Sequence, residues 1–235
     1  MKSILAFETS SPYLSVALGT RGGKIKELCS KTPLKHSENL ILLVDRLLRR
    51  EKISLKRIDA YAINRGPGSF TGLRIGFSFL KGLLVAEKKS CYGAVSLDMI
   101  AAKAGPRTGR LGVWVDARRD AVYSRFYIGQ KGEWVPEDEL QLLSLSELKR
   151  QRGKGVTFTG DALARCQSSV QEAFGNHVNF LGKESWYPSA ATLVKWFQTQ
   201  DSRLSPLKNP RDFLPLYFRA SEAEEKRRNL IAHVP

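Results

Sequence analysis

Residues 66–76 have the sequence GPGSFTGLRIG, a glycine-rich turn that leads into an apolar segment. The spacing differs from two common phosphate-binding loops, because no Gly-Lys-Ser/Thr ends the stretch and GxGxxxG is not the dinucleotide fingerprint GxGxxG. Two interpretations stay open. N–H groups at the start of a helix could hold an anion, or Gly68, Gly72 and Gly76 could let another helix approach closely. Close packing is favoured, since each glycine inside a helix costs about 1 kcal/mol relative to alanine and a tight contact offsets that cost.

The segments on either side of this stretch predict an α/β unit. Residues 58–64 form an apolar run that stops at the glycine-rich turn, which is typical of a buried strand. Ser69 can cap a helix that extends to about residue 86, with an apolar stripe along one side. A strand, a glycine-rich turn and a helix in this order are typical of α/β proteins.

The same order of elements occurs in both halves of the chain. In the first half, strands are expected at 3–8, 13–18 and 24–30, with helices at 37–50, capped by Ser37, and at 96–104, capped by Ser96. In the second half, strands are expected at 111–115, 121–128, after Gly132 and at 156–159, with helices at 144–151, at 161–174, capped by Asp161, and at 189–199. This repetition predicts two related lobes, residues 1–105 and 106–219, with a cleft between them and a charged tail at 220–235.

The composition narrows the class of protein. The 235-residue chain has 38 Lys and Arg against 23 Asp and Glu, a formal net charge of +15. This charge either attracts a polyanion such as nucleic acid or serves general solubility, and the sequence favours neither. No apolar run approaches the roughly 18 residues that a membrane span needs, so a cytoplasmic location without a membrane partner is expected. The three cysteines and three histidines are scattered and lack the spacing of a disulfide framework or a metal site.

Several shorter motifs accompany GPGSFTGLRIG. They are LAFETSS at 5–11, SVAL at 15–18, HSE at 36–38, DARR at 116–119 with VY at 122–123, GDA at 160–162 and PLYFR at 215–219. Over residues 3–219, the sequence resembles the TsaB family, also called YeaZ, whose members are bacterial proteins of threonylcarbamoyladenosine biosynthesis on tRNA. One departure from the family pattern is Glu8, where the family usually has Asp.

The resemblance implies an α/β fold of the actin/Hsp70/sugar-kinase-like (ASKHA) type, with two related lobes, the second reduced. It also implies a non-catalytic scaffold subunit, required for N6-threonylcarbamoyladenosine (t6A) at adenosine 37 of tRNAs that read ANN codons. The implied partners are TsaD, a catalytic paralogue that forms a heterodimer with TsaB, the ATPase TsaE, and tRNA through the complex. Alone, the chain is expected to form a homodimer. No cofactor of its own is implied, because ATP and metal belong to the partner subunits.

Active members of that fold hold ATP between the lobes, in two hairpins. The first hairpin here, residues 8–12, offers hydroxyl and N–H groups, but Pro12 removes one donor. The second, residues 116–120, has two long arginines where glycines would give a phosphate a close backbone cradle. We therefore predict no catalytic residue and no metal ligand. The predicted weak contacts to a nucleotide or anion come from Thr9, Ser10, Gly68, Ser69 and Arg118.

The two helices expected at 37–50 and 69–86 carry more apolar residues than one core-facing stripe requires. The surplus consists of Ile41, Leu42, Phe70, Phe79 and Leu83. Such a surplus marks an interaction surface, and the resemblance implies that this helical face joins TsaB to TsaD. The predicted interface consists of His36, Leu40, Leu43, Leu47, Phe70, Gly72, Leu73, Gly76, Phe77 and Leu80. Two alternative functions stay open: an ATP-dependent kinase or ATPase of the same fold, and a stand-alone RNA-binding protein.

Overall fold

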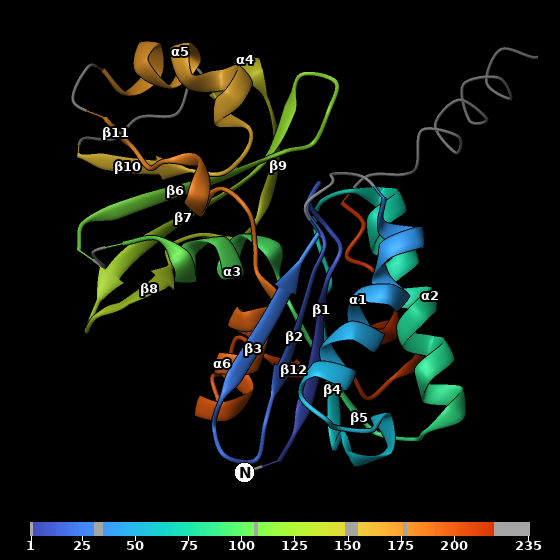
Figure 1. Cartoon of the computed structure of the whole chain (residues 1–235). Helices are drawn as coiled ribbons and strands as arrows, with labels where there is room; N and C mark the ends of the chain where they lie inside the picture. The colour runs from blue at the N-terminus through green and yellow to red at the C-terminus, as the bar shows by residue number, and fades with distance from the viewer. Residues whose placement is uncertain (1, 31–34, 106–107, 149–154, 176–177, 219–235) are drawn as a thin grey trace, which may run out of the picture.

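The molecule consists of two lobes, each built on one β-sheet (Figure 1). The computed structural model describes residues 2–30, 35–105, 108–148, 155–175 and 178–218. The expected tail at 220–235 and the end of the helix expected at 144–151 lie outside these ranges. Within them, no helix is both long and apolar enough to cross a membrane.

The first sheet has the strand order β12-β5-β4-β1-β2-β3. β1 pairs antiparallel with β2 and parallel with β4, and β4 pairs parallel with β5. The strands are β1 (Ile4–Glu8), β2 (Ser15–Gly19), β3 (Ile25–Cys29), β4 (Ala60–Asn64), β5 (Ser90–Ala94) and β12 (Ser205–Pro206).

The second sheet repeats this arrangement, with the order β11-β10-β6-β7-β8. β6 pairs antiparallel with β7 and parallel with β10, as β1 does with β2 and β4. The strands are β6 (Arg110–Asp116), β7 (Ala121–Gln130), β8 (Glu133–Pro136), β10 (Val156–Thr159) and β11 (Asn179–Phe180), and β9 (Gln141–Ser144) also pairs with β7. In each sheet, three consecutive antiparallel strands are followed by two parallel strands. This repetition confirms the predicted actin/Hsp70/sugar-kinase-like fold of two related lobes.

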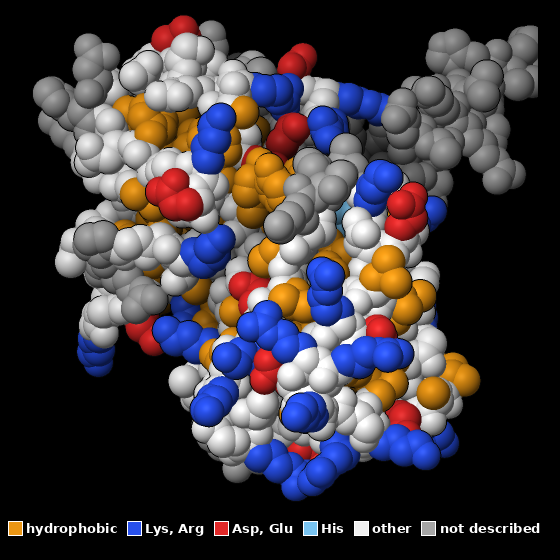
Figure 2. Space-filling view, viewed as in Figure 1, with side chains coloured by type: hydrophobic (Ala, Val, Ile, Leu, Met, Phe, Trp, Pro, Cys, Tyr) orange, Lys and Arg blue, Asp and Glu red, His pale blue; other side chains and the backbone are white. Residues whose placement is uncertain are grey.

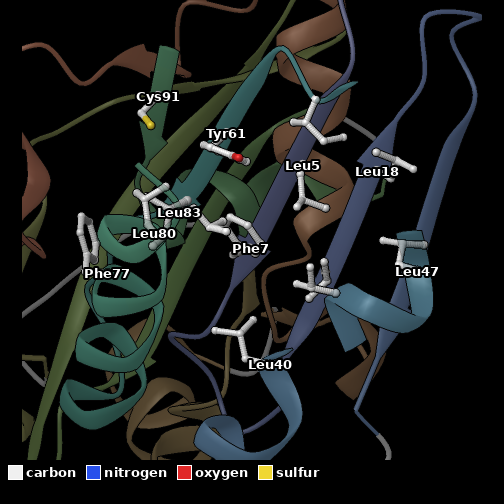
Figure 3. Close-up of a cluster of buried hydrophobic side chains, with 14 of the residues drawn as sticks. Leu5, Phe7, Leu18, Leu40, Leu47, Tyr61, Phe77, Leu80, Leu83 and Cys91 are labelled. Carbon is white, nitrogen blue, oxygen red and sulfur yellow. The ribbon is translucent and has the colours of Figure 1, made fainter. Parts of the chain in front are cut away.

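Helices cover both faces of the first sheet. α1 (His36–Arg50) and α2 (Phe70–Ala86) cover one face, and α6 (Ala190–Thr199) covers the other. On the second sheet, α3 (Ser96–Lys103) packs on one face, and α4 (Leu145–Leu148) and α5 (Leu163–Phe174) pack on the other. Short 3-10 turns are η1 (Leu55–Arg57), η2 (Lys183–Ser185) and η3 (Pro210–Phe213). Leu5 and Phe7 of β1 point to α1 and α2, where they join a core that includes Leu40, Leu47, Tyr61, Phe77 and Leu80 (Figure 3). Ile4 and Ala6 point to the other face and pack with α6, because successive strand residues alternate between faces.

The boundary between the lobes differs from the one expected at residue 105. α6 packs on β1 and β2, and β12 extends the first sheet by pairing with β5. Residues 190–207, which the sequence placed in the second lobe, therefore belong to the first. Conversely, α3 packs on the second sheet, because its apolar residues Leu97, Ile100 and Ala101 join the core around β6 and β7. The pattern of elements alone contains no information about which sheet a late helix covers.

Three of the expected helix caps are wrong. α1 begins at His36 with Lys35 as N-cap, α3 has Val95 as N-cap, and α5 begins at Leu163, so Ser37, Ser96 and Asp161 are not caps. The Ser69 cap is confirmed, since its hydroxyl accepts a hydrogen bond from the N–H of Gly72 at 3.2 Å. Ser96 and Asp161 bind more distant partners instead.

Candidate functional site

A buried carboxylate organises the turn that follows β1. Oε1 of Glu8, which is fully buried, accepts hydrogen bonds from the N–H of Ser10 at 2.8 Å, the hydroxyl of Ser10 at 2.9 Å and the N–H of Ser11 at 3.1 Å. Its other oxygen, Oε2, accepts one from the amide of Asn64. The buried side chain of Glu8 thus fixes the backbone of the turn that follows it.

Asn64 and Ser96 extend this network to two further elements. The amide of Asn64, at the end of β4, also donates to the hydroxyl of Ser10 at 2.8 Å. Its oxygen Oδ1 accepts from the N–H of Gly66 at 2.9 Å and from the hydroxyl of Ser96, at the start of α3, at 3.0 Å. Sequence reasoning missed Asn64 and Ser96. The available signal was a polar residue at or just beyond the end of each of two strands, Asn64 as the last residue of β4 and Ser96 two residues after β5, since the carboxyl ends of parallel neighbours meet at one sheet edge.

The environment of Glu8 shifts its ionisation. Burial raises the pKa of Glu8 from 4.5 to about 7, although the hydrogen bonds from Asn64, Ser10 and Ser11 favour the charged form and act in the opposite direction. Desolvation outweighs four donors because the carboxylate has no contact with solvent. Near neutral pH, the network therefore contains both the charged and the neutral carboxyl group.

The glycine-rich motif packs directly over this turn. The N–H of Ser69 donates to the carbonyl of Ser10 at 2.6 Å. A Cβ at Gly72 would lie 2.0 Å from the carbonyl oxygen of Thr9, and one at Gly76 would lie 2.4 Å from the Thr9 hydroxyl. The glycines thus permit a close approach, as the packing interpretation expects, but the neighbour is the turn after β1 and not a second helix.

The first helical residue of α1 also contacts the turn. His36 is buried, and its Nε2 lies 2.8 Å from the carbonyl oxygen of Ser11, so the ring nitrogen donates to that oxygen. Burial lowers the pKa of His36. In this structure, His36 ties α1 to the interior of the same chain.

The equivalent turn of the second lobe follows β6, and hydrogen bonds and an ion pair of Asp116 hold it in place. Asp116 accepts from the N–H of Arg118 at 2.9 Å, pairs with Arg165, and donates its own N–H to Asp161 at 2.9 Å. Arg118, Arg119 and Asp120 all have positive φ, which non-glycine residues rarely adopt. The side chain of Arg118 is 84% exposed.

The residues predicted to contact a nucleotide or anion thus have different surroundings. Thr9 and Ser10 are buried, and the N–H groups of Ser69 and Gly72 donate within the chain. Arg118 is exposed at the other lobe. Among the described residues, no group of three or more His, Cys, Asp or Glu side chains could hold a metal ion.

A groove of about 540 Å³ runs between the first two turns of α1 and the first three turns of α2. It is lined by Ser37, Leu40, Ile41, Phe70, Thr71, Arg74, Ile75, Ser78 and Phe79. Ile41 is 61% exposed and the adjacent Leu42 is 64% exposed. Such apolar exposure on neighbouring positions is typical of an interaction surface.

The residues of the predicted partner interface divide into two groups. Leu40, Leu47, Leu73, Phe77 and Leu80 are buried in the chain's own core, with Gly72 and Gly76 buried against the turn after β1. Leu43 and Phe70 are half-buried at the surface, as is Phe79, whereas Leu83 is buried. Ile41 and Leu42 are therefore the most exposed members of the apolar surplus.

The repeated sheets and the two self-closed turns define the class of this molecule as a two-lobed, actin-like α/β protein whose hairpins are held by internal contacts. A family model described as "TsaD: tRNA N6-adenosine threonylcarbamoyltransferase" matches residues 21–227. The chain is 26% identical over 228 residues to the tRNA threonylcarbamoyladenosine biosynthesis protein TsaB of Bacillus subtilis (strain 168), covering 95% of this chain and 97% of that protein. It is 34% identical over 140 residues to TsaB of Escherichia coli (strain K12), a match that covers 57% of this chain and 59% of that protein.

Solved structures agree with the sequence comparisons. YeaZ from Pseudomonas aeruginosa matches with a TM-score of 0.75 at 25% identity, over 93% of this chain and all of that chain. The chain belongs to the family that this model describes, and within it to the TsaB (YeaZ) proteins.

Proposed function

We propose that this chain is a non-catalytic scaffold subunit of t6A biosynthesis in the cytoplasm, acting on adenosine 37 of tRNAs that read ANN codons. It forms a heterodimer with a TsaD-type paralogue, which carries the metal and the nucleotide chemistry, and it works with a TsaE-type ATPase. The support from relatives is that a protein matched over nearly its whole length, TsaB of Bacillus subtilis, is named for this biosynthesis. The observation that carries the proposal is the exposed apolar groove between α1 and α2.

The groove suits a protein partner better than a small polar ligand. Its exposed wall on α1 includes the aliphatic side chain of Ile41, and the adjacent Leu42, outside the lining, is also exposed. On the α2 side, the guanidinium of Arg74 lies 3.9 Å from the centre of the Phe70 ring, which gives the groove a cationic rim. An apolar centre with a polar rim is the usual anatomy of a protein interface.

The turns argue for a subunit without its own ATP chemistry. In the first lobe, the groups that would face a phosphate are engaged with Glu8, Asn64 and the carbonyl of Ser10. In the second lobe, Asp116 is paired with Arg165. A phosphate would have to displace these contacts, each of which is charge-assisted or buried.

The proposal is tested by reconstitution. Purified TsaD-type and TsaE-type partners, threonylcarbamoyl-adenylate and unmodified tRNA are combined with and without this chain, and modified adenosine is measured by mass spectrometry. Modification is expected only when the chain is present, and the chain alone is expected neither to hydrolyse ATP nor to modify tRNA. ATP turnover by the chain alone that disappears in Asp116→Ala would overturn the proposal in favour of an enzyme.

A further inference from the structure

The amino ends of three parallel strands place several basic segments at one edge of the first sheet. Ile4 of β1 lies opposite Ala60 of β4, and Ala60 lies opposite Ser90 of β5. Ile4 also lies opposite Gly19, so the turn between β2 and β3 reaches the same edge. Segments that are far apart in sequence thus converge at the end of the lobe away from Glu8.

These segments are rich in lysine and arginine. Their cations are Lys2, Arg21, Lys24, Arg49, Arg50, Lys52, Lys56, Arg57, Lys88 and Lys89, and the nearby acids are Glu51, Asp59 and Glu87. We call this surface the basic end. Lys and Arg side chains gather over this lower end of the first lobe in Figure 2.

Internal contacts hold the segments of the basic end together. The ammonium of Lys89 donates to the carbonyl of Leu55 at 2.9 Å, and the hydroxyl of Ser3 donates to the carbonyl of Arg57 at 2.7 Å. These two bonds link three of the segments: the start of β1, the residues between α1 and β4, and the residues just before β5. The Lys and Arg residues of the basic end therefore lie on segments that are hydrogen-bonded to one another, and not on independent loops.

About half of these charges have no acidic partner. Arg21, Arg49, Arg50 and Lys89 form ion pairs with Asp59, Asp45, Glu51 and Glu87. Within the described part of the chain, no ion pair involves the exposed side chains of Lys2, Lys24, Lys52, Lys56, Arg57 or Lys88. Unpaired cations that converge on one surface create the potential that attracts a polyanion.

Helix capping accounts for only part of the basic end. Arg49 and Arg50 lie in the last turn of α1, where cations offset the negative end of the helix dipole. Lys2 and Lys24 lie before β1 and in the turn before β3, where no helix ends. Helix stability therefore does not explain their charge, and their convergence with the other cations on one surface favours binding of an external anion over general solubility.

We infer that the basic end binds the sugar-phosphate backbone of tRNA while the groove holds a protein partner. The inference rests on the proposed function for the identity of the RNA. On α1, the groove lining ends at Ile41 and the basic end begins at Arg49, about 12 Å further along the helix axis, so the two surfaces share no residue. Both can be occupied at once, and recognition is by charge and not by base sequence.

Salt dependence of RNA binding tests the inference. Binding of fluorescent unmodified tRNA to the chain, and to its complex with the TsaD-type partner, is measured by anisotropy over a series of salt concentrations. In Lys56→Gln/Arg57→Gln, the slope of log affinity against log salt is expected to fall by about 2, because each lost phosphate contact removes about 0.9. At about 0.1 M salt, this weakens binding roughly tenfold or more.

The matched control is Lys131→Gln/Lys183→Gln, which removes the same charge from exposed positions of the second lobe. It is expected to bind like wild type, and melting temperatures confirm that both variants fold. Equal slopes and affinities for the two double variants would overturn the inference. So would tighter binding of the chain to phosphatidylserine-containing vesicles than to tRNA. Because RNA binding is read without any modification reaction, it is judged separately from the reconstitution.

Discussion

Gly72 has no space for even a methyl group. A Cβ at this position would lie 2.0 Å from the backbone oxygen of Thr9, which cannot rotate away. We expect Gly72→Ala to lower the free energy of unfolding by about 1–3 kcal/mol, the usual cost of overpacking, measured by urea denaturation. The control is Gly82→Ala in the same helix, where a Cβ would meet nothing within 4 Å and helix stability should rise by about 0.5–1 kcal/mol. If both variants are stabilised, the motif does not pack on the turn as described.

The carboxyl group of Glu8 makes stability depend on pH. Its pKa is raised from 4.5 to about 7 by burial, so the folded state keeps a proton that the unfolded state loses above pH 4.5. The contribution to stability is fully present below pH 4.5 and is lost as pH rises to about 7. We expect the unfolding free energy of wild type, relative to Glu8→Gln, to fall by about 3 kcal/mol over this interval. Urea denaturation at a series of pH values measures it, and a difference independent of pH would contradict it.

At the level of helices and strands, the sequence predicts the order of elements well because apolar periodicity and glycine turns are local. Helix caps are predicted less well, since a polar side chain may have a better partner elsewhere in the fold. Ser96 donates to Asn64, and Asp161 accepts from Asp116, so neither caps the helix beside it. The network of Glu8 was missed for a related reason: polar residues at the strand ends are visible in the sequence, but only the strand order shows that Glu8, Asn64 and Ser96 meet.

The exposed wall of α1 yields a prediction about partner binding. Ile41→Asp places a charge in the lining of the groove, which should weaken association with a TsaD-type partner at least tenfold, about 1.4 kcal/mol, in calorimetry. Stability should change little, because Ile41 is 61% exposed. The matched control is Val85→Asp, at an 89% exposed position near the end of α2 and outside the groove lining. Equal weakening by both variants would indicate that the groove is not the interface.

The two lobes are joined by a charge cluster on α3, which follows β5 of the first sheet but packs on the second. Asp98 accepts from the hydroxyl of Tyr127 at 2.6 Å and from the guanidinium of Arg125 at 3.1 Å, both on β7. The side chains of Arg125 and Asp98 are only 15% and 8% exposed. Breaking such a pair leaves the buried Arg125 with the carbonyl of Asp138 as an acceptor but without the Asp98 carboxylate, which costs far more than the loss of an exposed ion pair.

We therefore expect Asp98→Ala to lower the unfolding free energy by about 3–5 kcal/mol, because Tyr127 loses its acceptor and Arg125 loses its carboxylate partner. Tyr127→Phe removes one hydrogen bond and leaves the ion pair, so it should cost about 1–2 kcal/mol. The control is Asp45→Ala, which removes an exposed pair with Arg49 on α1 and should change stability little, because solvent screens the pair. Urea unfolding followed by fluorescence and circular dichroism measures all three. If Asp98→Ala costs no more than Asp45→Ala, α3 does not couple the lobes through this cluster, and the apolar contacts of Leu97 and Ile100 with the second sheet hold them together instead.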